Sequence, residues 1–174
     1  EQWEIAGDRP GILLTKTGSV AYGLKLSDTA DNSRISGLKI EGFDDYGIFT
    51  AAETSQIGMD CVGTPDDTQR NVIVANGRTG LHLGSADNNI IAGNWIGLAD
   101  DGVTSDPNGG GTLTHSYTEM NMNNSNSNVI GYEDGDDYPA YVCTAAQARN
   151  VFGIGSYNSI TLDNSSTKNN ISGN

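Results

Sequence analysis

The sequence predicts an all-β fold, a solenoid of about eight coils made of short stacked strands. Three observations lead to this prediction. A short apolar motif, read as Asn-x-Ile-x-Gly, recurs at steps of 16 to 39 residues. Gly and Asn are unusually frequent between the apolar segments. No apolar period of 3.6 residues extends over the length of a helix.

The repeat is clearest over residues 70–97 and returns over 149–174. Its apolar centre falls on Ile35, Ile57, Ile73, Ile91, Ile130, Phe152 and Ile171. The longest step, 39 residues between Ile91 and Ile130, counts as two coils of about 20 residues. With one more coil upstream, we expect about eight coils and a height on the order of 40 Å, at about 4.8 Å per strand layer.

The corners between strands are predicted from composition. The chain has 23 Gly and 18 Asn, and both residue types tolerate the left-handed backbone angles of sharp corners. Asn residues at the same corner of successive coils also stack, because each side-chain amide hydrogen-bonds to the next. We therefore expect ladders of Asn side chains along the solenoid.

Three segments carry a family resemblance: Asn-Asn-Ile-Ile-Ala-Gly-Asn-Trp-Ile-Gly (88–97), Arg-Asn-Val-Ile-Val-Ala-Asn (70–76) and Asn-Val-Ile-Gly (128–131). They resemble the repeats of right-handed parallel β-helix proteins of the pectin-lyase-like superfamily, and are most similar to repeats of large secreted prokaryotic surface proteins. The resemblance covers about residues 22–174 and implies an extracellular or cell-surface location. It implies no single activity, because the superfamily includes lyases, hydrolases, epimerases, tailspikes and adhesins.

Length and charge limit the remaining choices. We expect a single β-helix domain over residues 1–174. The net charge of −13 and the pI of about 4.2 disfavour nucleic acids and anionic membrane surfaces as partners. No apolar run reaches the roughly 18 residues that suggest a membrane span, so no membrane insertion is expected. Because the chain begins with Glu1, we hypothesise that a leader was removed.

The first part of the chain supplies the first strands. Residues 1–21 are a first coil or an end segment, with a turn at 9–11 followed by a buried strand at 12–14. Segments that begin at Tyr22 and Tyr46 start two strands 24 residues apart. The two tyrosines are expected to stack as a stabilising aromatic ladder, with a sugar-binding platform as the alternative.

Two loops, within residues 51–70 and 131–148, each contain one cysteine. Both follow Ile-Gly and precede Arg-Asn, so both should leave the solenoid on the same side. The expected separation of about five layers is 20–25 Å, whereas a disulfide requires Cα atoms within about 7 Å. A Cys61–Cys143 disulfide therefore requires long loops that approach each other, and free buried thiols are the alternative.

The second half contains the largest break in the pattern, an irregular insertion at residues 98–128. Its polar run at 121–128 is either a disordered loop or a stacked Asn corner. Residues 149–174 restore the repeat, and no polar capping segment follows them. An uncapped coil is covered either by neighbouring domains of a longer chain or by another copy placed end to end, which would form a filament.

Calcium is the one metal that the sequence suggests, because clustered loop carboxylates supply the oxygen ligands that it prefers. The best candidate cluster is Glu133, Asp134, Asp136 and Asp137, and two weaker pairs are Asp66/Asp67 and Asp100/Asp101. None of them matches an EF-hand loop or a nonapeptide calcium repeat. No other cofactor is expected.

No catalytic residue is predicted. Pectinases of the superfamily that the chain resembles would use Asp residues with Gly-His-Gly and Arg-x-Lys, and the lyases would use Ca²⁺-binding aspartates with an arginine base. Neither His82 nor His115 is flanked by glycines. Arg34 lacks the following lysine, and Arg70 and Arg149 occupy equivalent repeat positions, which favours a structural role. His82 is expected to be an outward strand residue. Asn123, Asn164 and Asn170 match the N-glycosylation pattern, which arises by chance in such a chain.

These observations favour a structural or adhesive β-helix module of an extracellular surface protein, with end-to-end stacking into filaments as its mode of assembly. Its expected partners are copies of itself, neighbouring domains or a polysaccharide. The alternative is a carbohydrate-active enzyme or a polysaccharide-binding domain with its ligand along one flank. Carboxylates that converge on one flank would favour the enzyme.

Overall fold

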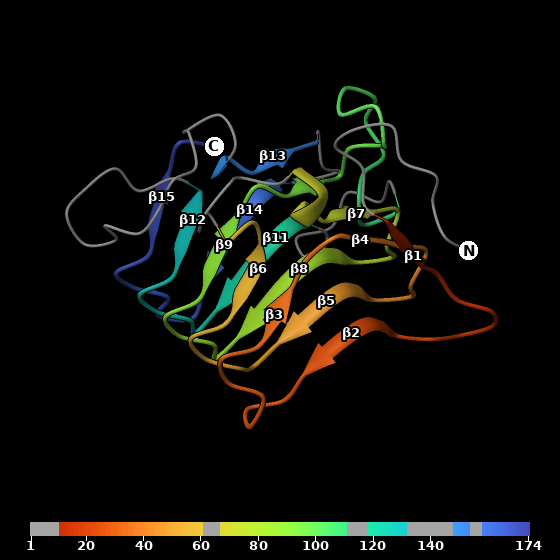
Figure 1. Cartoon of the computed structure of the whole chain (residues 1–174). Coiled ribbons are helices and arrows are strands. Elements are labelled where there is room, and N and C mark those ends of the chain that lie inside the picture. Colours follow the sequence, from red (N-terminus) through yellow and green to blue (C-terminus); the bar gives the residue numbers. More distant parts are fainter. Residues whose placement is uncertain (1–10, 61–66, 111–117, 132–147, 154–157) are drawn as a thin grey trace.

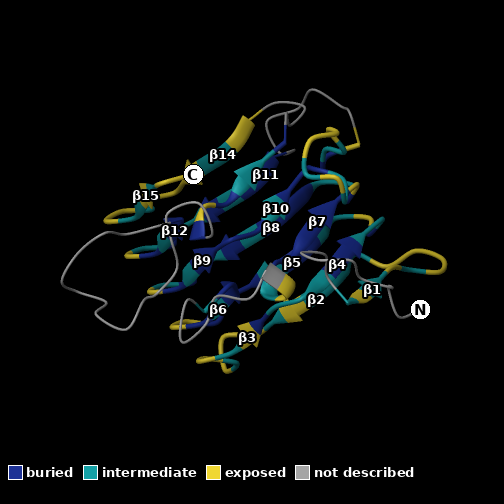
Figure 2. Cartoon of the chain, turned by 45° about the horizontal axis from the view of Figure 1, so that its top comes forward, coloured by how far each residue is buried: buried dark blue, intermediate teal, exposed yellow. Residues whose placement is uncertain are grey.

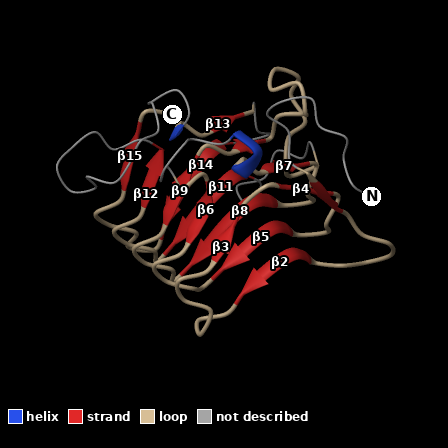
Figure 3. Cartoon of the chain, viewed as in Figure 1, coloured by secondary structure: helices blue, strands red, loops and turns tan. Residues whose placement is uncertain are grey.

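The computed structural model describes residues 11–60, 67–110, 118–131, 148–153 and 158–174. Their strands form three parallel sheets of five strands each, here named A, B and C (Figure 1). After β1 in sheet A, the chain visits the sheets in the order B, C, A and then returns to B in the next layer. The architecture is therefore a parallel β-solenoid in which each coil contributes one strand to each sheet, and Figure 3 shows the strands stacked in successive layers.

The strands of each sheet are as follows. Sheet A contains β1 (Ile12–Leu14), β4 (Leu38–Glu41), β7 (Val72–Val74), β10 (Trp95–Ile96) and β13 (Val151–Phe152). Sheet B contains β2 (Tyr22–Leu26), β5 (Tyr46–Thr50), β8 (Thr79–Gly84), β11 (Thr118–Asn123) and β14 (Asn158–Asp163). Sheet C contains β3 (Arg34–Ile35), β6 (Gln56–Gly58), β9 (Ile90–Ala92), β12 (Val129–Gly131) and β15 (Asn170–Ser172). A 3-10 turn, η1 (Asp67–Gln69), lies between β6 and β7.

The predicted number of coils is not confirmed, because the sequence motif marks two sheets rather than one. Five of the repeat residues are aligned in register across sheet C, and they are Ile35, Ile57, Ile91, Ile130 and Ile171. The other two, Ile73 and Phe152, belong to sheet A, where they align with Ile40 and Ile96. The motif therefore occurs about twice per coil, and each sheet has five strands in the described residues.

The core lies inside the coils and consists mainly of stacked Ile, Leu and Met side chains. Figure 2 shows buried residues along the middle strands and exposed residues toward the outermost layers and the turns. Ile48, Leu81 and Met120 occupy aligned inward positions of sheet B and are completely buried. The inward faces of the short strands form this core, and β7 is also buried on its other face, with Val72, Ile73 and Val74 all inaccessible to solvent. Because the strands are short and the layers cover one another, 36% hydrophobic residues suffice.

Buried Asn ladders follow several corners of the described coils, which confirms that prediction. In the first, Nδ2 of Asn71 donates to Oδ1 of Asn94 (2.9 Å), Asn94 donates to Asn150 (2.9 Å), and Asn150 donates to Asn174 (3.1 Å). In each step from Asn94 onward, the backbone N–H also donates to the same Oδ1 atom. The ladders therefore satisfy backbone donors that the corner would otherwise leave unpaired.

The second ladder passes through Asn89, Asn128 and Asn169, whose side chains are joined by two hydrogen bonds of 3.1 Å. Asn128 ends the polar run at 121–128, so the stacked Asn corner is the correct alternative for this end of the run. The predicted irregular insertion at 98–128 also contains β11, a regular strand of sheet B. Its irregular described part is residues 98–110, with a bridge between Leu98 and Ser105.

One interior position of sheet B changes residue type along the stack. The register aligns Gly23, Gly47, Gly80 and Glu119. A Cβ atom on Gly80 would lie 2.6 Å from Nδ2 of Asn108 and 2.8 Å from a methyl group of Ile96, so this position faces the interior. Glu119 is fully buried there, and its Oε1 atom has no hydrogen-bond partner.

Candidate functional site

The outer face of sheet B is the candidate functional site. Its residues depend on a break in the inward–outward alternation of β8, where the adjacent residues Gly80 and Leu81 both face inward. In β8, Leu81 and Leu83 are buried in the core, so His82 between them faces outward. Because Gly80 faces inward beside Leu81, Thr79 lies on the outer side like His82. The outward position of His82 confirms the prediction made from the sequence.

Register arranges the outward residues into rows that cross the strands. Tyr46, Thr79 and Thr118 form one row. Phe49, His82 and Asn121 form the next. Parallel in-register pairing places each row member about 4.8 Å from the next, so residues distant in sequence share one surface.

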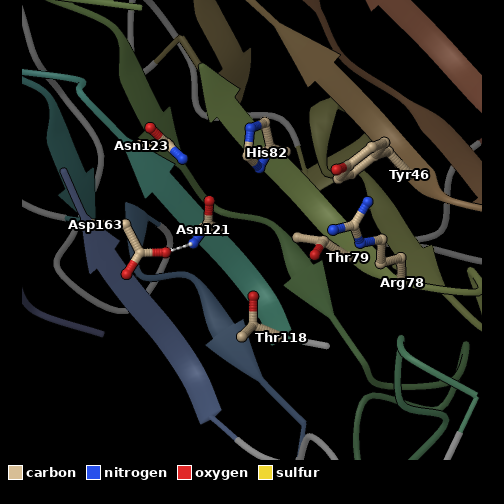
Figure 4. A pocket seen from close by; sticks show the side chains of 8 residues that line it. All are labelled: Tyr46, Arg78, Thr79, His82, Thr118, Asn121, Asn123 and Asp163. Carbon is tan, nitrogen blue, oxygen red and sulfur yellow. Dashed lines mark hydrogen bonds between the residues drawn. The ribbon is translucent and has the colours of Figure 1, made fainter. Parts of the chain in front are cut away.

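A groove of about 310 Å³ lies on this face. Its lining residues are Tyr46, Arg78, Thr79, His82, Thr118, Asn121, Asn123 and Asp163 (Figure 4). They come from β5, β8, β11 and β14 and from the residue that precedes β8. The lining is predominantly polar, so hydrogen bonding would dominate the recognition of a ligand.

Stacked rings form one side of the groove and extend beyond it. Tyr22 and Tyr46 stack with centroids 5.6 Å apart and planes at 15°, which confirms the predicted ladder. Phe49 and His82 stack in the next row, at 5.2 Å and 15°. The centroids of Tyr46 and His82 are 5.0 Å apart. These contacts fix the orientation of the His82 ring at the groove.

Two cations lie on the aromatic side. Nζ of Lys25 is 5.1 Å from the centroid of Tyr22, and Cζ of Arg78 is 5.6 Å from the centroid of Tyr46. Both separations are in the range of cation–π interactions. No carboxylate of the described residues lies within salt-bridge distance of Arg78.

Amides and a carboxylate form the opposite side. Nδ2 of Asn121 donates to Oδ2 of Asp163 at 2.8 Å, the bond drawn in Figure 4. Oδ1 of Asn123 accepts a hydrogen bond from Asn164 at 3.1 Å. These bonds hold the polar side chains in place while leaving further acceptor capacity on the carboxylate.

Burial, together with the positive charge of Arg78, lowers the pKa of His82 to about 4. The negative charge of Asp163 acts in the opposite direction. His82 is therefore neutral at pH 7 and experiences charges of both signs.

Thr118 contributes a hydroxyl group whose hydrogen-bonding capacity is unused. The residue is only 1% exposed, and Oγ1 has no hydrogen-bond partner. An unpaired buried hydroxyl typically costs about 1–3 kcal/mol, so a polar atom at the base of the groove would be favourable.

The described lining includes a single carboxylate, Asp163. Most glycoside hydrolases use a pair of carboxyl groups on either side of the scissile bond. Within the described residues, this groove does not form such a pair.

Several predicted site residues lie elsewhere. The calcium candidates Glu133, Asp134, Asp136 and Asp137, together with Cys61, Cys143, Asp66 and His115, lie outside the described residues. Asp100 pairs with Lys39 at 3.0 Å, and Asp101 accepts hydrogen bonds from Thr104 within its own turn. No cluster of three or more potential metal ligands occurs in the part of the chain that the structure describes.

The loops that contain the two cysteines both connect sheet C to sheet A, which confirms that they leave on the same side. The predicted separation of about five layers is wrong. Only β9 lies between β6 and β12, so these strands are two layers apart, about 10 Å. Cys61 and Cys143 themselves lie outside the described residues, so the disulfide stays a prediction.

Arginines and Asn residues from the sequence also have defined places. Arg70 is buried and lies over the ring of Trp95 at 4.5 Å, whereas Arg149 at the equivalent corner is exposed. Arg34 pairs with Asp60 at 2.5 Å. Of the glycosylation candidates, Asn123 lies in β11, Asn164 in the turn after β14 and Asn170 in β15. Two of these candidates are in contact, because Asn164 donates a hydrogen bond to Asn123 at the groove.

Comparison with known proteins gives no assignment: no family model matches the chain, and no match is found among curated proteins or solved structures. Among the described residues, no helix is both long and apolar enough to cross a membrane.

The sequence did not indicate Arg78, Asn121 and Asp163 as site residues. Each is an ordinary polar residue in its local context, and the three are separated by about 40 positions at each step. The useful signal was the Tyr22–Tyr46 repeat. Thr79 and Thr118 occupy the position of Tyr46 in the next two coils, so following this position along the chain would have located the row.

Proposed function

We propose that this chain is an adhesive module of an extracellular surface protein, and that the outer face of sheet B binds polysaccharide. The groove bordered by Tyr46, His82 and Asn121 is the observation on which the proposal rests. We further propose that the coil is right-handed and related to the pectin-lyase-like proteins that its repeats resemble. The number of strands per coil agrees with such an architecture.

The chemistry of the lining supports a saccharide ligand. Sugars present many hydroxyl groups, which pair with amides, carboxylates and hydroxyls such as those of Asn121, Asp163 and Thr118. Their C–H faces pack against ring surfaces, and Tyr46 and His82 border the groove. The groove is elongated across four coils, so a chain of sugars that lies along the solenoid would contact several layers at once.

The preformed character of the face also supports binding. Its side chains lie on strands whose backbone is held by parallel pairing on both sides, except at the edge strand β14. A rigid surface loses little conformational entropy on binding, and repeated weak contacts then give useful affinity. An adhesive role requires this combination of an extended rigid scaffold and a repeated contact surface.

The proposal is tested with affinity electrophoresis and calorimetry against neutral, acidic and amino polysaccharides, each with and without Ca²⁺. Binding should weaken about tenfold or more in Tyr46→Ala and in Asn121→Ala. It should be unchanged in Asn32→Gly, an exposed turn residue with a φ of 60° that suits glycine. Analysis of the same mixtures for shortened chains tests the alternative of a carbohydrate-active enzyme. Absence of binding to every polysaccharide would reject the proposal.

End-to-end assembly is a second candidate, favoured by the strands at one end of the stack. β14 and β15 are edge strands, and the side chains of Leu162 and Ile171 are 46% and 40% exposed. Edge strands present unpaired backbone groups that promote association. Negative-stain electron microscopy at rising protein concentration tests this mode, which predicts filaments of solenoid width. Dispersed short rods at all concentrations would reject it.

A further inference from the structure

The groove contains one positive and one negative side chain, at different places along the stack. Arg78 precedes β8 in the third layer of sheet B, and Asp163 ends β14 in the fifth. Figure 4 shows them on opposite sides of the groove, with Thr79 and Asn121 between them. Two layer steps separate their strands by about 10 Å, and Asp163 aligns through Asn123 with Gly84, six residues along the strand from Arg78. The two charges are therefore too far apart for one sugar ring to contact both.

Neither charge is neutralised within the described residues. The guanidinium of Arg78 lies over Tyr46, and the described partner of the Asp163 carboxylate is the neutral amide of Asn121. Lys16, Arg34 and Lys39 pair with carboxylates. Arg78 lies over an aromatic ring instead, as Lys25 and Arg70 do.

The residues between the two charges are neutral at pH 7. Thr79, Thr118 and Asn121 carry no charge, and His82 stays unprotonated because burial lowers its pKa to about 4. A ligand would therefore meet one positive site and one negative site, separated by hydrogen-bonding groups. Two sites of opposite charge select against ligands that carry only one sign, because one of the two sites then repels them.

We propose that the groove recognises an amphoteric polysaccharide, in which sugars that carry an anionic group alternate with sugars that carry a free amine. An anion pairs with Arg78 and an ammonium group farther along the ligand pairs with Asp163, while the sugars between them lie over Thr79 and Asn121. This inference rests on the saccharide binding proposed above and specifies the ligand class. A polyuronate would pair with Arg78 but be repelled by Asp163. A polymer of amino sugars would pair with Asp163 but be repelled by Arg78.

The test uses four oligosaccharides with one backbone. The first alternates glucuronate and glucosamine, the second is its N-acetylated form, the third is its carboxyl-reduced form, and the fourth has both changes and is neutral. Calorimetry at pH 7 should show the first binding about threefold to fivefold tighter than the second or the third, and about tenfold or more tighter than the fourth. Each charge contact at a partly exposed site is expected to contribute about threefold to fivefold.

Two variants assign the charges. Arg78→Gln should remove the advantage of the carboxylate and leave the affinity for the carboxyl-reduced form unchanged. Asp163→Asn should remove the advantage of the amine and leave the affinity for the N-acetylated form unchanged. Arg34→Gln on β3 and the exposed Asp28→Asn are matched controls that should change neither, and thermal melting confirms that all four variants fold.

The outcomes separate the two proposals. If all four oligosaccharides bind with similar affinity, saccharide binding stands and the amphoteric preference is rejected. The preference is also rejected if the N-acetylated form binds as tightly as the amphoteric one, or if Asp163→Asn leaves the amine selectivity intact. If none of the four binds, this inference is rejected, and the saccharide function is decided separately by the panel of neutral, acidic and amino polysaccharides.

Discussion

Oε2 of Glu119 accepts two hydrogen bonds from Asn108, one from the side-chain Nδ2 at 2.6 Å and one from the backbone N–H at 3.3 Å. Asn108 in turn accepts a hydrogen bond from Nδ2 of Asn76 at 2.8 Å. A carboxyl group therefore ends a buried ladder of Asn side chains in the interior of the solenoid. The ladder connects the irregular residues 98–110 to the regular coils on both sides.

The first prediction concerns the pH dependence of stability at Glu119. Burial raises the pKa of Glu119 to about 7, although the hydrogen bonds from Asn108 act in the opposite direction. The folded state therefore binds a proton more tightly than the unfolded state. This contribution to stability is complete below about pH 4.5 and is lost as the pH rises through about 7, a decrease of about 3 kcal/mol.

Glu119→Gln should remove this decrease, because the amide has the shape of the acid and carries no charge. Urea denaturation at pH 5 and pH 8 gives the free energy of unfolding at each pH for the variant and the wild type. The exposed Glu53→Gln is the control and should behave like the wild type. Parallel pH profiles for wild type and Glu119→Gln would contradict the assignment.

The second prediction concerns the Asn ladder at sheet A. Asn94 accepts from Asn71 and donates to Asn150 and to the backbone oxygen of Ile57 (2.9 Å), all in the interior. Asn94→Ala leaves several buried groups without partners and should lower the free energy of unfolding by about 2–4 kcal/mol. Asn158→Ala, an exposed change on β14, should cost less than about 0.5 kcal/mol. Equal effects in a denaturant titration would count against a structural role for the ladder.

The third prediction concerns the inward glycine of β8. Gly80→Ala would place Cβ 2.8 Å from both the backbone oxygen of Glu119 and a methyl group of Ile96. Because the backbone oxygen cannot move independently of its strand, we expect a loss of about 2 kcal/mol in the free energy of unfolding. Gly84→Ala on the outer face of the same strand has its nearest contacts at 3.3 Å and should be tolerated. Thermal melting of the two variants tests this prediction, and Gly80→Ala should have the lower melting temperature. Similar melting temperatures would mean that the interior around Gly80 is not closely packed.

The fourth prediction concerns acid sensitivity at His82. Its folded pKa of about 4 lies below its ordinary value of 6.5, because the buried ring resists protonation. The stability that His82 contributes is therefore present above about pH 6.5 and decreases as the pH falls toward 4. His82→Phe preserves the stack on Phe49 and cannot be protonated, so it should lose less stability than the wild type between pH 7 and pH 4.5. Since all carboxylates are common to both proteins, an identical loss would show that His82 does not titrate as described.

Some features of the fold were predictable because they depend on neighbouring residues. Short apolar strands bounded by Gly and Asn, the Asn ladders and the Tyr22–Tyr46 stack all follow from local pattern and from one repeat interval. The number of coils did not follow, because Ile35 and Ile73 occur in similar local sequences but belong to different sheets. Local sequence specifies a strand and a corner, whereas the sheet to which a strand belongs depends on the path of the whole coil.

The candidate site was less predictable for the same reason. The residues that begin the five strands of sheet B are Tyr22, Tyr46, Thr79, Thr118 and Asn158, and the steps between them grow from 24 to 40 residues. Successive strands of the sheet lie one layer apart whatever the length of the connection between them. The number of residues between two positions therefore does not predict their distance in space. Without the register, Arg78, Asn121 and Asp163 have no common feature that would group them.

The sequence by itself determined that this chain is a β-solenoid with Asn-lined corners, since apolar alternation and corner-forming residues act over a few positions. Only the tertiary structure decided which side chains share a surface and which charges face each other. Backbone hydrogen bonds between successive layers set the register, and the inward packing of residues such as Leu81 and Met120 decides which neighbours face outward. The groove between Arg78 and Asp163 results from those long-range contacts.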